Sequence, residues 1–209
     1  ISETEYSKTA ELIADVVCKM EIKKHLAKNA AKAVHTGILT DTGSYNHNTS
    51  YPNTFKVVSE LMNFGIDTQK IKSGFYHNFS ASRMKLLGYC LSQKMVVFPE
   101  LRTAMISITK KELEDFEFKT GDTEGFVNFP LSINDIVFSA IFIEKEGIVK
   151  ASFRSKGSFP ANHFSRDNFN GGGHLNAAGG DTKLSIEEAV EKFTQNLPNN
   201  KHQLLETII

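Results

Sequence analysis

A run of three glycines inside the segment 170–180 (NGGGHLNAAGG) most constrains how this chain can fold. Glycine loses more backbone entropy on ordering than any other residue, so such a run is typical of backbone that approaches another group closely or takes positive φ. His174 follows the run, and the small residues Ala177 and Ala178 would let a helix begin close to a sheet. We expect a glycine turn before a helix N-terminus whose free amides bind a phosphate, with His174 at the rim. The alternative is a mobile glycine linker, although the apolar Ala177-Ala178 pair argues against it.

A strand with one polar face precedes this run. The segment 148–153 alternates apolar with polar residues, which predicts a strand that is buried on one side only. Arg154 follows on the polar face at the strand's end, and Ser155 begins the loop. A guanidinium binds a phosphate or carboxylate through two parallel hydrogen bonds, so Arg154 is a candidate ligand-binding residue. The alternative is a surface arginine that pairs with Glu144 or Glu146.

A third motif lies near the beginning of the chain. The segment 38–40 (ILT) is short, apolar and partly β-branched, and it leads directly into Asp41. We predict that a helix over 23–35 stops at Gly37, ahead of this segment. A carboxylate at the end of a buried segment suits a hard cation, which takes oxygen ligands held by a firm backbone. From the residues alone a turn cap is an equally good interpretation, because Asp before a glycine turn is common.

These motifs occur in the order found in DHH-type phosphoesterases. The segment 171–174 (GGGH), with its following Ala-Ala-Gly, resembles the signature of the domain that follows the DHH catalytic domain, and 153–157 (FRSKG) resembles the strand end that accompanies it. The segment 36–43 (TGILTDTG) is similar to the last metal-binding motif of the catalytic domain. The resemblance covers essentially the whole chain and implies an α/β protein: a helical C-terminal part of a DHH catalytic domain over 1–93, then a small α/β substrate-binding domain with a mixed sheet over 94–209. No Asp-His-His occurs in the sequence, so we expect the chain to be the C-terminal portion of a longer enzyme.

The resemblance also implies a mechanism and a set of site residues. DHH enzymes use two divalent ions, usually manganese with magnesium as the alternative, to activate water against phosphorus. It implies that Asp41 is a catalytic residue and one metal ligand. The group most similar in size and motifs hydrolyses short oligoribonucleotides and phosphoadenosine phosphate, and includes proteins described as exopolyphosphatase-related. The substrate-binding residues implied for this chain are Arg154, Ser155, Asn162, Gly171, Gly172, Gly173 and His174.

Two other functions stay open on the sequence. A phosphodiesterase for linear or cyclic dinucleotides would need the same groups. A non-catalytic RNA-binding module would resemble the domain at the end of alanyl-tRNA synthetases. The balance of 24 basic and 24 acidic residues argues against a protein held to long nucleic acid by charge, and a binding module has no need of a buried aspartate at position 41.

The rest of the sequence predicts the frame of the molecule. No apolar run approaches the length of a membrane span, and Cys18 and Cys90 are typical of buried thiols in a reducing compartment, so we expect a cytoplasmic protein without membrane contact. A homodimer is compatible with these observations. His47 is expected to be a surface residue, and Arg83 a solvated or packing arginine and not a phosphate ligand. We expect helices over 3–20, 53–64, 67–77, 80–92, 109–118 and 185–197, strands over 95–98, 102–108, 136–143 and 148–153, and a tail over 199–209.

Overall fold

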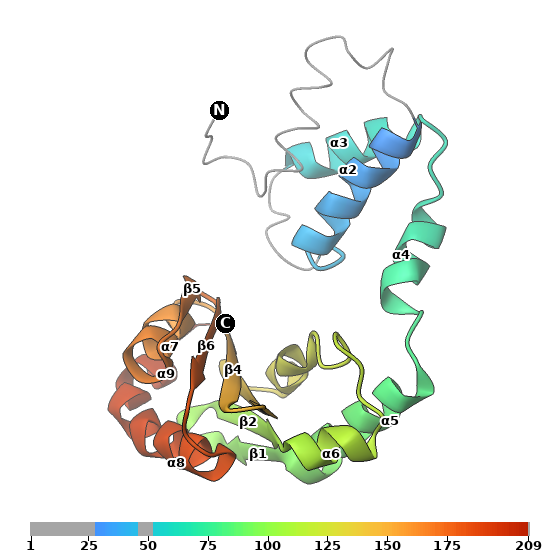
Figure 1. Ribbon diagram of the computed structural model, residues 1–209. Helices are drawn as coiled ribbons and strands as arrows, with labels where there is room; N and C mark the ends of the chain where they lie inside the picture. Colours follow the sequence, from blue (N-terminus) through green and yellow to red (C-terminus); the bar gives the residue numbers. More distant parts are fainter. Residues whose placement is uncertain (1–27, 46–51, 209) are drawn as a thin grey trace. The chain divides into compact units, whose positions relative to one another are not determined.

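The computed structural model describes residues 28–45 and 52–208 (Figure 1). The chain divides into two compact units, Ile1–Phe79 and Ser80–Ile209. Three expectations fall outside the described residues: the helix over 3–20, Cys18 and His47.

The described part of the first unit contains three helices, α2 (Lys28–Asp41), α3 (Pro52–Met62) and α4 (Thr68–Tyr76). Asp67 begins α4 as predicted, because its Oδ1 accepts a hydrogen bond from the backbone N–H of Lys70 at 2.8 Å. The helices share one apolar core, whose buried members are Ala31, Ile38, Leu39, Val57, Leu61, Ile66 and Ile71.

The end of α2 differs from the prediction. The helix continues through Gly37, so Ile38, Leu39 and Thr40 are helical and do not form a short extended segment. Ile38 and Leu39 are only 1% and 2% exposed in the core of this unit. Burial of two large apolar side chains outweighs the ~1 kcal/mol that a glycine costs inside a helix. Asp41 is therefore the exposed last residue of a helix.

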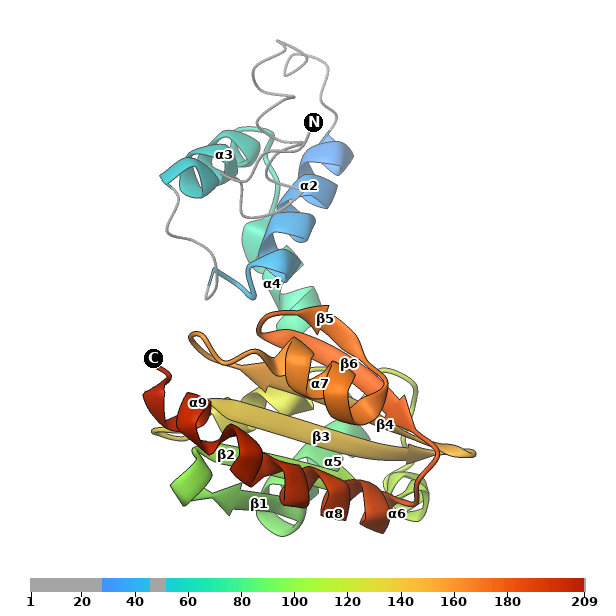
Figure 2. The same ribbon diagram turned by 90° about the vertical axis from the view of Figure 1, so that its left-hand side faces the viewer.

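The second unit is built on a six-stranded mixed sheet of order β1-β2-β3-β4-β6-β5 (Figure 2). β2 and β3 are parallel, and every other neighbouring pair is antiparallel. The predicted α/β class with a mixed sheet is confirmed, and the four predicted strands correspond to β1, β2, β3 and β4. The strands are β1 (Met95–Phe98), β2 (Thr103–Ile108), β3 (Phe138–Lys145), β4 (Ile148–Ser155), β5 (Gly172–His174) and β6 (Ala177–Thr182).

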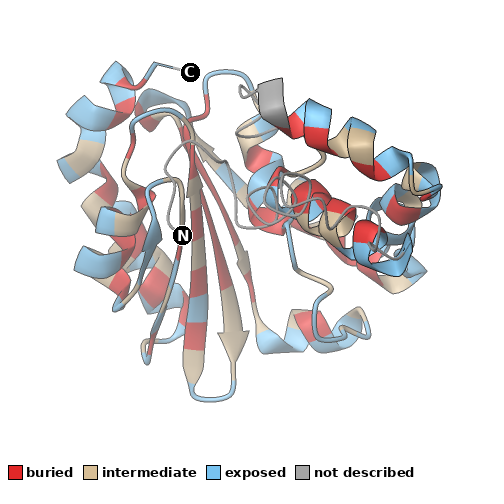
Figure 3. Ribbon diagram, turned by 90° about the horizontal axis from the view of Figure 1, so that it is seen from above, coloured by how far each residue is buried: buried red, intermediate tan, exposed pale blue. Residues whose placement is uncertain are grey.

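Helices lie on both sides of this sheet. Figure 2 shows α7, α8 and α9 in front of the strands and α5 behind them, and Figure 3 shows buried residues alternating with exposed ones along these elements. Within residues 28–45 and 52–208, no helix has the length and apolar character that crossing a membrane requires. The helical segments of the second unit are α5 (Ala81–Tyr89), η2 (Cys90–Lys94), η3 (Pro99–Leu101), α6 (Lys110–Asp115), η4 (Phe126–Ser132), α7 (Ala161–Phe169), α8 (Ile186–Asn196), η5 (Leu197–Asn200) and α9 (Lys201–Glu206).

Phenylalanine rings fill the space between the sheet and the layer of α7, α8 and α9. The ring centroids of Phe138 and Phe159 are 4.7 Å apart, and those of Phe138 and Phe164 are 5.1 Å apart, within the range of favourable aromatic pairs. Phe153 of β4 is fully buried in this cluster. Because side chains alternate along a strand, burial of Phe153 directs Arg154 to the opposite face of the sheet.

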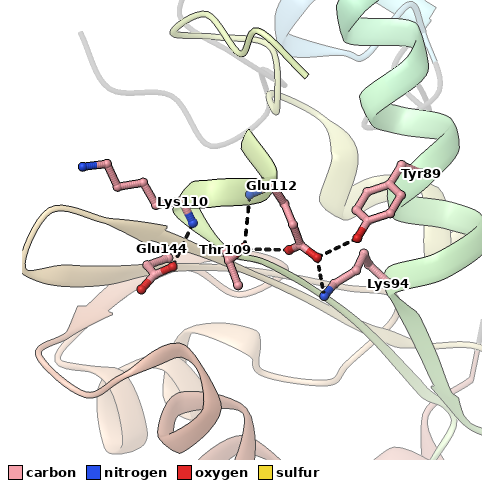
Figure 4. Close-up of polar contacts among 6 residues, drawn as sticks. All are labelled: Tyr89, Lys94, Thr109, Lys110, Glu112 and Glu144. Carbon is pink, nitrogen blue, oxygen red and sulfur yellow. Dashed lines mark hydrogen bonds and ion pairs between the residues drawn. The ribbon is translucent and has the colours of Figure 1, made fainter. Parts of the chain in front are cut away.

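The helix α5 belongs to the second unit, so the chain divides earlier than the predicted boundary at residues 93–94. The hydroxyl of Tyr89 donates to Oε1 of Glu112 at 2.6 Å, and the ammonium of Lys94 lies 2.9 Å from the same oxygen (Figure 4). These contacts join the end of α5 and η2 to α6. That the first unit is part of a DHH catalytic domain stays a prediction.

Residues 199–209 were expected to form a tail, and this is wrong for the described part. The segment forms the end of η5 and the helix α9, and Leu204 is fully buried in the core of the second unit. The guanidinium of Arg102 holds the end of α9: its Nη1 donates to the carbonyl oxygens of Leu204 at 3.1 Å and Thr207 at 2.7 Å. A short terminal segment is thus ordered by a contact distant in sequence.

Two predictions about single residues are confirmed. Cys90 is buried, and burial followed by the charge of Glu112 raises the pKa of its thiol to about 12. Arg83 packs its guanidinium 5.0 Å from the ring centroid of Phe126 and donates to the carbonyl oxygen of Glu124 at 2.8 Å. Both residues therefore belong to the framework of the second unit.

Candidate functional site

The glycine run forms a strand, which differs from the predicted turn before a helix. Gly172–His174 is β5, and it pairs antiparallel with β6, which begins at Ala177. The helix next to the run is α7, which precedes it and is followed by the capping residue Asn170 with a left-handed φ of 48°. The segment Ala177–Thr182 is extended because it pairs with β4 on its other side. The predicted anion site at a helix N-terminus is therefore wrong.

The three positions of the glycine run differ in how strictly they require glycine. A Cβ at Gly171 would overlap the carbonyl oxygen of Gly179, and Gly173 has a φ of 141° that side-chain-bearing residues rarely adopt. A Cβ at Gly172 would meet no atom within 4 Å, and its φ lies outside the positive range. The hairpin thus requires glycine at positions 171 and 173, whereas position 172 is open space.

Arg154, Ala177 and His174 lie in one row across three neighbouring strands. Arg154 pairs with Ala177, and Ala177 pairs with His174. Residues paired directly across strands project from the same face of the sheet. Since neighbouring strands are about 4.8 Å apart, the backbones of Arg154 and His174 are separated by roughly 10 Å. Ala177, whose side chain is a single methyl group, lies between the two residues in this row.

This row lies on a face of β4, β6 and β5 that we call the open face. Over β2 and β3 the same side of the sheet is covered by an apolar cluster that includes Ile106, Ile141 and residues of α5 and η4. Among the described residues, no apolar cluster includes side chains of β4, β6 or β5 from this side. The members of the open face, all exposed or half-buried, are Lys150, Ser152, Arg154, Gly172, His174, Ala177, Gly179 and Asp181.

Arg154 is half-buried, and its guanidinium is only partly used within the fold. Its Nη1 donates to the carbonyl oxygen of Phe153 at 2.9 Å and lies 3.5 Å from that of Ala178. Burial lowers the pKa of Arg154, and the charge of Glu124 opposes this effect. Within the described residues, Nε and Nη2 of Arg154 have no hydrogen-bond partner. A guanidinium in this state can bind an anion with its remaining donors.

The alternative interpretation of Arg154, an ion pair with a nearby glutamate, is not observed. Glu144 accepts a hydrogen bond from the backbone N–H of Lys110 at 2.8 Å, as Figure 4 shows, and Glu146 pairs with the ammonium of Lys110 at 2.9 Å. Both carboxylates are therefore engaged by Lys110.

Ser155 holds the turn beside this row. It is the buried last residue of β4, and its hydroxyl donates to the carbonyl oxygen of Phe159 at 2.7 Å. The hydroxyl oxygen of Ser155 also accepts a hydrogen bond from Nδ2 of Asn176 at 2.9 Å, and this Nδ2 donates to the carbonyl oxygen of Gly157 at 3.0 Å as well. Asn176 joins β5 to β6, and the sequence analysis did not select it although it belongs to the glycine-rich segment. The Ser155–Asn176 contact positions the hairpin next to Arg154.

Asn162 lies on the other side of the hairpin. It is in the first turn of α7, where its Oδ1 accepts from the backbone N–H of His163 at 2.9 Å. Its Nδ2 is 3.4 Å from the carbonyl oxygen of Gly173, a weak hydrogen bond. Because α7 packs on the side of the sheet opposite the open face, the structure does not bring Asn162 into the row of Arg154 and His174.

The described residues do not form a metal centre. Over 28–45 and 52–208, no group of three or more His, Cys, Asp or Glu side chains is placed to hold an ion. Asp41 is an exposed carboxylate at the end of a helix, not at the end of a buried strand as expected. A single carboxylate does not fit a pair of divalent ions, so no reaction step through a metal follows from these residues.

The comparisons with known proteins agree with this architecture. Residues 103–199 match the model of the DHHA1 domain. This match lies within the second unit and covers most of it. The predicted resemblance to the C-terminal portion of DHH-family proteins is therefore confirmed, and the match includes most of the sheet, α7 and α8.

The similar proteins are longer than this chain. It is 27% identical over 188 residues to the bifunctional oligoribonuclease and PAP phosphatase NrnA of Thermus thermophilus, covering 90% of this chain and 55% of the relative. It is 27% identical over 180 residues to the protein of the same name from Bacillus subtilis, covering 85% and 55%. A solved exopolyphosphatase-related protein from Bacteroides fragilis is 42% identical, with a TM-score of 0.96 over 99% of this chain and 60% of that one. The chain thus spans a little over half the length of these relatives.

Proposed function

We propose that the open face of the DHHA1 domain binds the nucleotide part of a short oligoribonucleotide or of phosphoadenosine phosphate. The complete protein would hydrolyse this substrate as a metal-dependent phosphoesterase. The observation that carries the proposal is the row formed by Arg154, Ala177 and His174, and the NrnA-type relatives support it.

The chemistry of the row suits a phosphate. Arg154 is partly removed from water, which strengthens its attraction to an anion, and charge-assisted hydrogen bonds contribute about 1.5–3 kcal/mol each. The exposed imidazole of His174 can donate to a phosphate oxygen or to a sugar hydroxyl. Ala177 has a small side chain, and Gly172 and Gly179 in the neighbouring row have none. A sugar or base can therefore lie against the backbone of the open face.

The metal-dependent step is assigned to the complete protein. When bound, two divalent ions, Mn²⁺ or alternatively Mg²⁺, would supply the activation of water and the charge stabilisation that phosphoester hydrolysis needs. Within the described residues we propose Asp41 as one ligand. As the last residue of α2 it adds a carboxylate to the negative end of the helix dipole, an arrangement that disfavours an anion and favours a cation.

Calorimetric titration of the chain with the dinucleotide ApA and with phosphoadenosine phosphate tests the binding proposal. We expect Arg154→Ala to weaken binding of both ligands by about tenfold or more, because a charge-assisted pair is lost. His174→Ala should weaken binding by a smaller factor. Lys201→Ala, an exposed change on α9 on the covered side of the sheet, serves as the control. Equal affinities of the wild type and Arg154→Ala would contradict the proposal.

The assignment of Asp41 has its own test. In the complete protein, Asp41→Asn keeps the side chain's shape but removes the charge that a hard cation requires. Titration with Mn²⁺ should show weakened binding while the melting temperature stays nearly constant, because Asp41 is exposed. Intact Mn²⁺ binding in this variant would show that Asp41 only terminates a helix.

A further inference from the structure

The open face extends beyond the row of Arg154 in one direction along the strands. In the next row, Ser152 pairs with Gly179, and Gly179 pairs with Gly172. In the row after that, Lys150 pairs with Asp181. Two residues along a strand advance by about 7 Å, so the backbones of Arg154 and Lys150 are roughly 13 Å apart on one face.

The middle row is nearly free of side chains. A Cβ at Gly172 would meet nothing within 4 Å, and one at Gly179 would make only an ordinary contact with the carbonyl oxygen of Ala151. Ser152 is the one residue of this row with a side chain, and it is small and half-buried. No large side chain of this row therefore obstructs an extended single strand that starts at Arg154.

The last row carries two opposite charges that do not pair. Lys150 and Asp181 are both exposed, and although they lie directly opposite each other, neither forms an ion pair with any other described residue. The ammonium of Lys150 is therefore able to bind a phosphate oxygen. The carboxylate of Asp181 stands beside it and repels the same phosphate.

We infer that Lys150 forms a second phosphate subsite, which is used by oligonucleotides longer than two residues, and that Asp181 weakens this subsite. The inference rests on the proposed function, in which Arg154 binds the first phosphate. A dinucleotide with one phosphodiester occupies only the row of Arg154. A tetranucleotide continues over the glycine row and reaches Lys150. The pair of residues at the far end of the open face thus sets the preference for substrate length.

The test compares two probes, the dinucleotide ApA and the tetranucleotide ApApApA, in equilibrium binding to the 209-residue chain. We expect Lys150→Ala to weaken tetranucleotide binding about threefold to tenfold, to leave dinucleotide binding unchanged, and to reduce the slope of log affinity against log salt by about 0.7 for the tetranucleotide. Lys150→Arg should retain the wild-type preference. Asp181→Asn should tighten tetranucleotide binding alone. Lys201→Ala on the opposite side of the sheet is the matched control.

The outcomes separate this inference from the proposed function. If Arg154→Ala abolishes binding of both probes while Lys150→Ala changes neither, the second subsite is overturned and the proposed function stands. If Lys150→Ala weakens both probes equally, Lys150 belongs to the first phosphate site, which also overturns the second subsite. If the wild type binds neither probe, both proposals are contradicted. Because Lys150 is exposed, the fold should survive both changes at this position, and unchanged dinucleotide binding by Lys150→Ala checks this directly.

Discussion

The guanidinium of Arg102 and the carbonyl oxygen of Thr207 lie 2.7 Å apart, although the two residues are 105 positions apart in the chain. Nη1 of Arg102 also reaches the carbonyl oxygen of Leu204, and its Nε donates to that of Asp135 at 3.0 Å. The carbonyl groups of Leu204 and Thr207 are at the end of α9, where a helix has no backbone donors of its own. Arg102 therefore acts as the cap of the C-terminal helix.

Replacement of Arg102 should loosen the end of the chain. We expect Arg102→Ala to lower the free energy of unfolding by about 2–3 kcal/mol, because several charged hydrogen bonds are lost together. Arg102→Lys keeps the charge but not the fork of donors, so it should restore only part of this loss. Urea unfolding measures both effects. A midpoint equal to that of the wild type in Arg102→Ala would show that α9 is held by the burial of Leu204 alone.

Stability should depend on acid pH through Glu112. Burial raises the pKa of Glu112, but hydrogen bonds from Tyr89, Thr109 and Lys94 outweigh this and lower it from 4.5 to about 2. A carboxyl whose folded pKa is depressed stabilises the protein fully above its unfolded pKa and loses this contribution as pH falls through the folded value. The shift corresponds to about 3 kcal/mol at pH 7, of which about 2 kcal/mol should be lost by pH 3.

Urea unfolding of the wild type and Glu112→Gln at pH 7 and pH 3 measures this contribution. The difference between the two proteins should be large at pH 7 and smaller at pH 3. Tyr89→Phe removes one of the hydrogen bonds and should give an intermediate result at pH 7. A difference that is the same at both pH values would contradict the role of the Glu112 charge.

The glycine run offers a direct comparison between folding and binding. Gly173→Ala should lower the melting temperature, because Gly173 has a φ of 141° and a Cβ there would lie against the backbone of Ala177 and Ala178. Gly172→Ala should leave the melting temperature nearly unchanged and should weaken dinucleotide binding, because the new methyl group projects into open space on the open face. Unchanged binding in Gly172→Ala would show that the ligand does not approach this strand.

Local signals in the sequence were sufficient for much of this fold. Ser80, Thr109 and Ser185 each cap the helix that the sequence predicts, since a capping hydrogen bond spans only three residues. The alternation that places Arg154 and Phe153 on opposite faces of the sheet was predictable for the same reason, because it depends only on neighbouring residues in one strand.

The predictions that failed depend on contacts between distant segments. Small residues such as Ala177 suit a helix as well as a strand, and only pairing with β4 decides that β6 is extended. The order of α9 depends on Arg102 in the same way. The row of Arg154 and His174 follows from the register of three strands, which a single sequence does not specify, so their proximity and the role of Asn176 could not be predicted.

In the proposed function, Arg154 binds the nucleotide and takes no part in bond breaking. Steady-state kinetics of the complete protein, with a dinucleotide and with a small activated phosphodiester that lacks the second nucleotide, tests it most directly. Arg154→Ala should raise KM for the dinucleotide by about one to two decades, as expected for one or two lost charge-assisted bonds, and should leave the small substrate almost unaffected. Equal losses on both substrates would contradict the account, because they would place Arg154 at the reacting phosphorus.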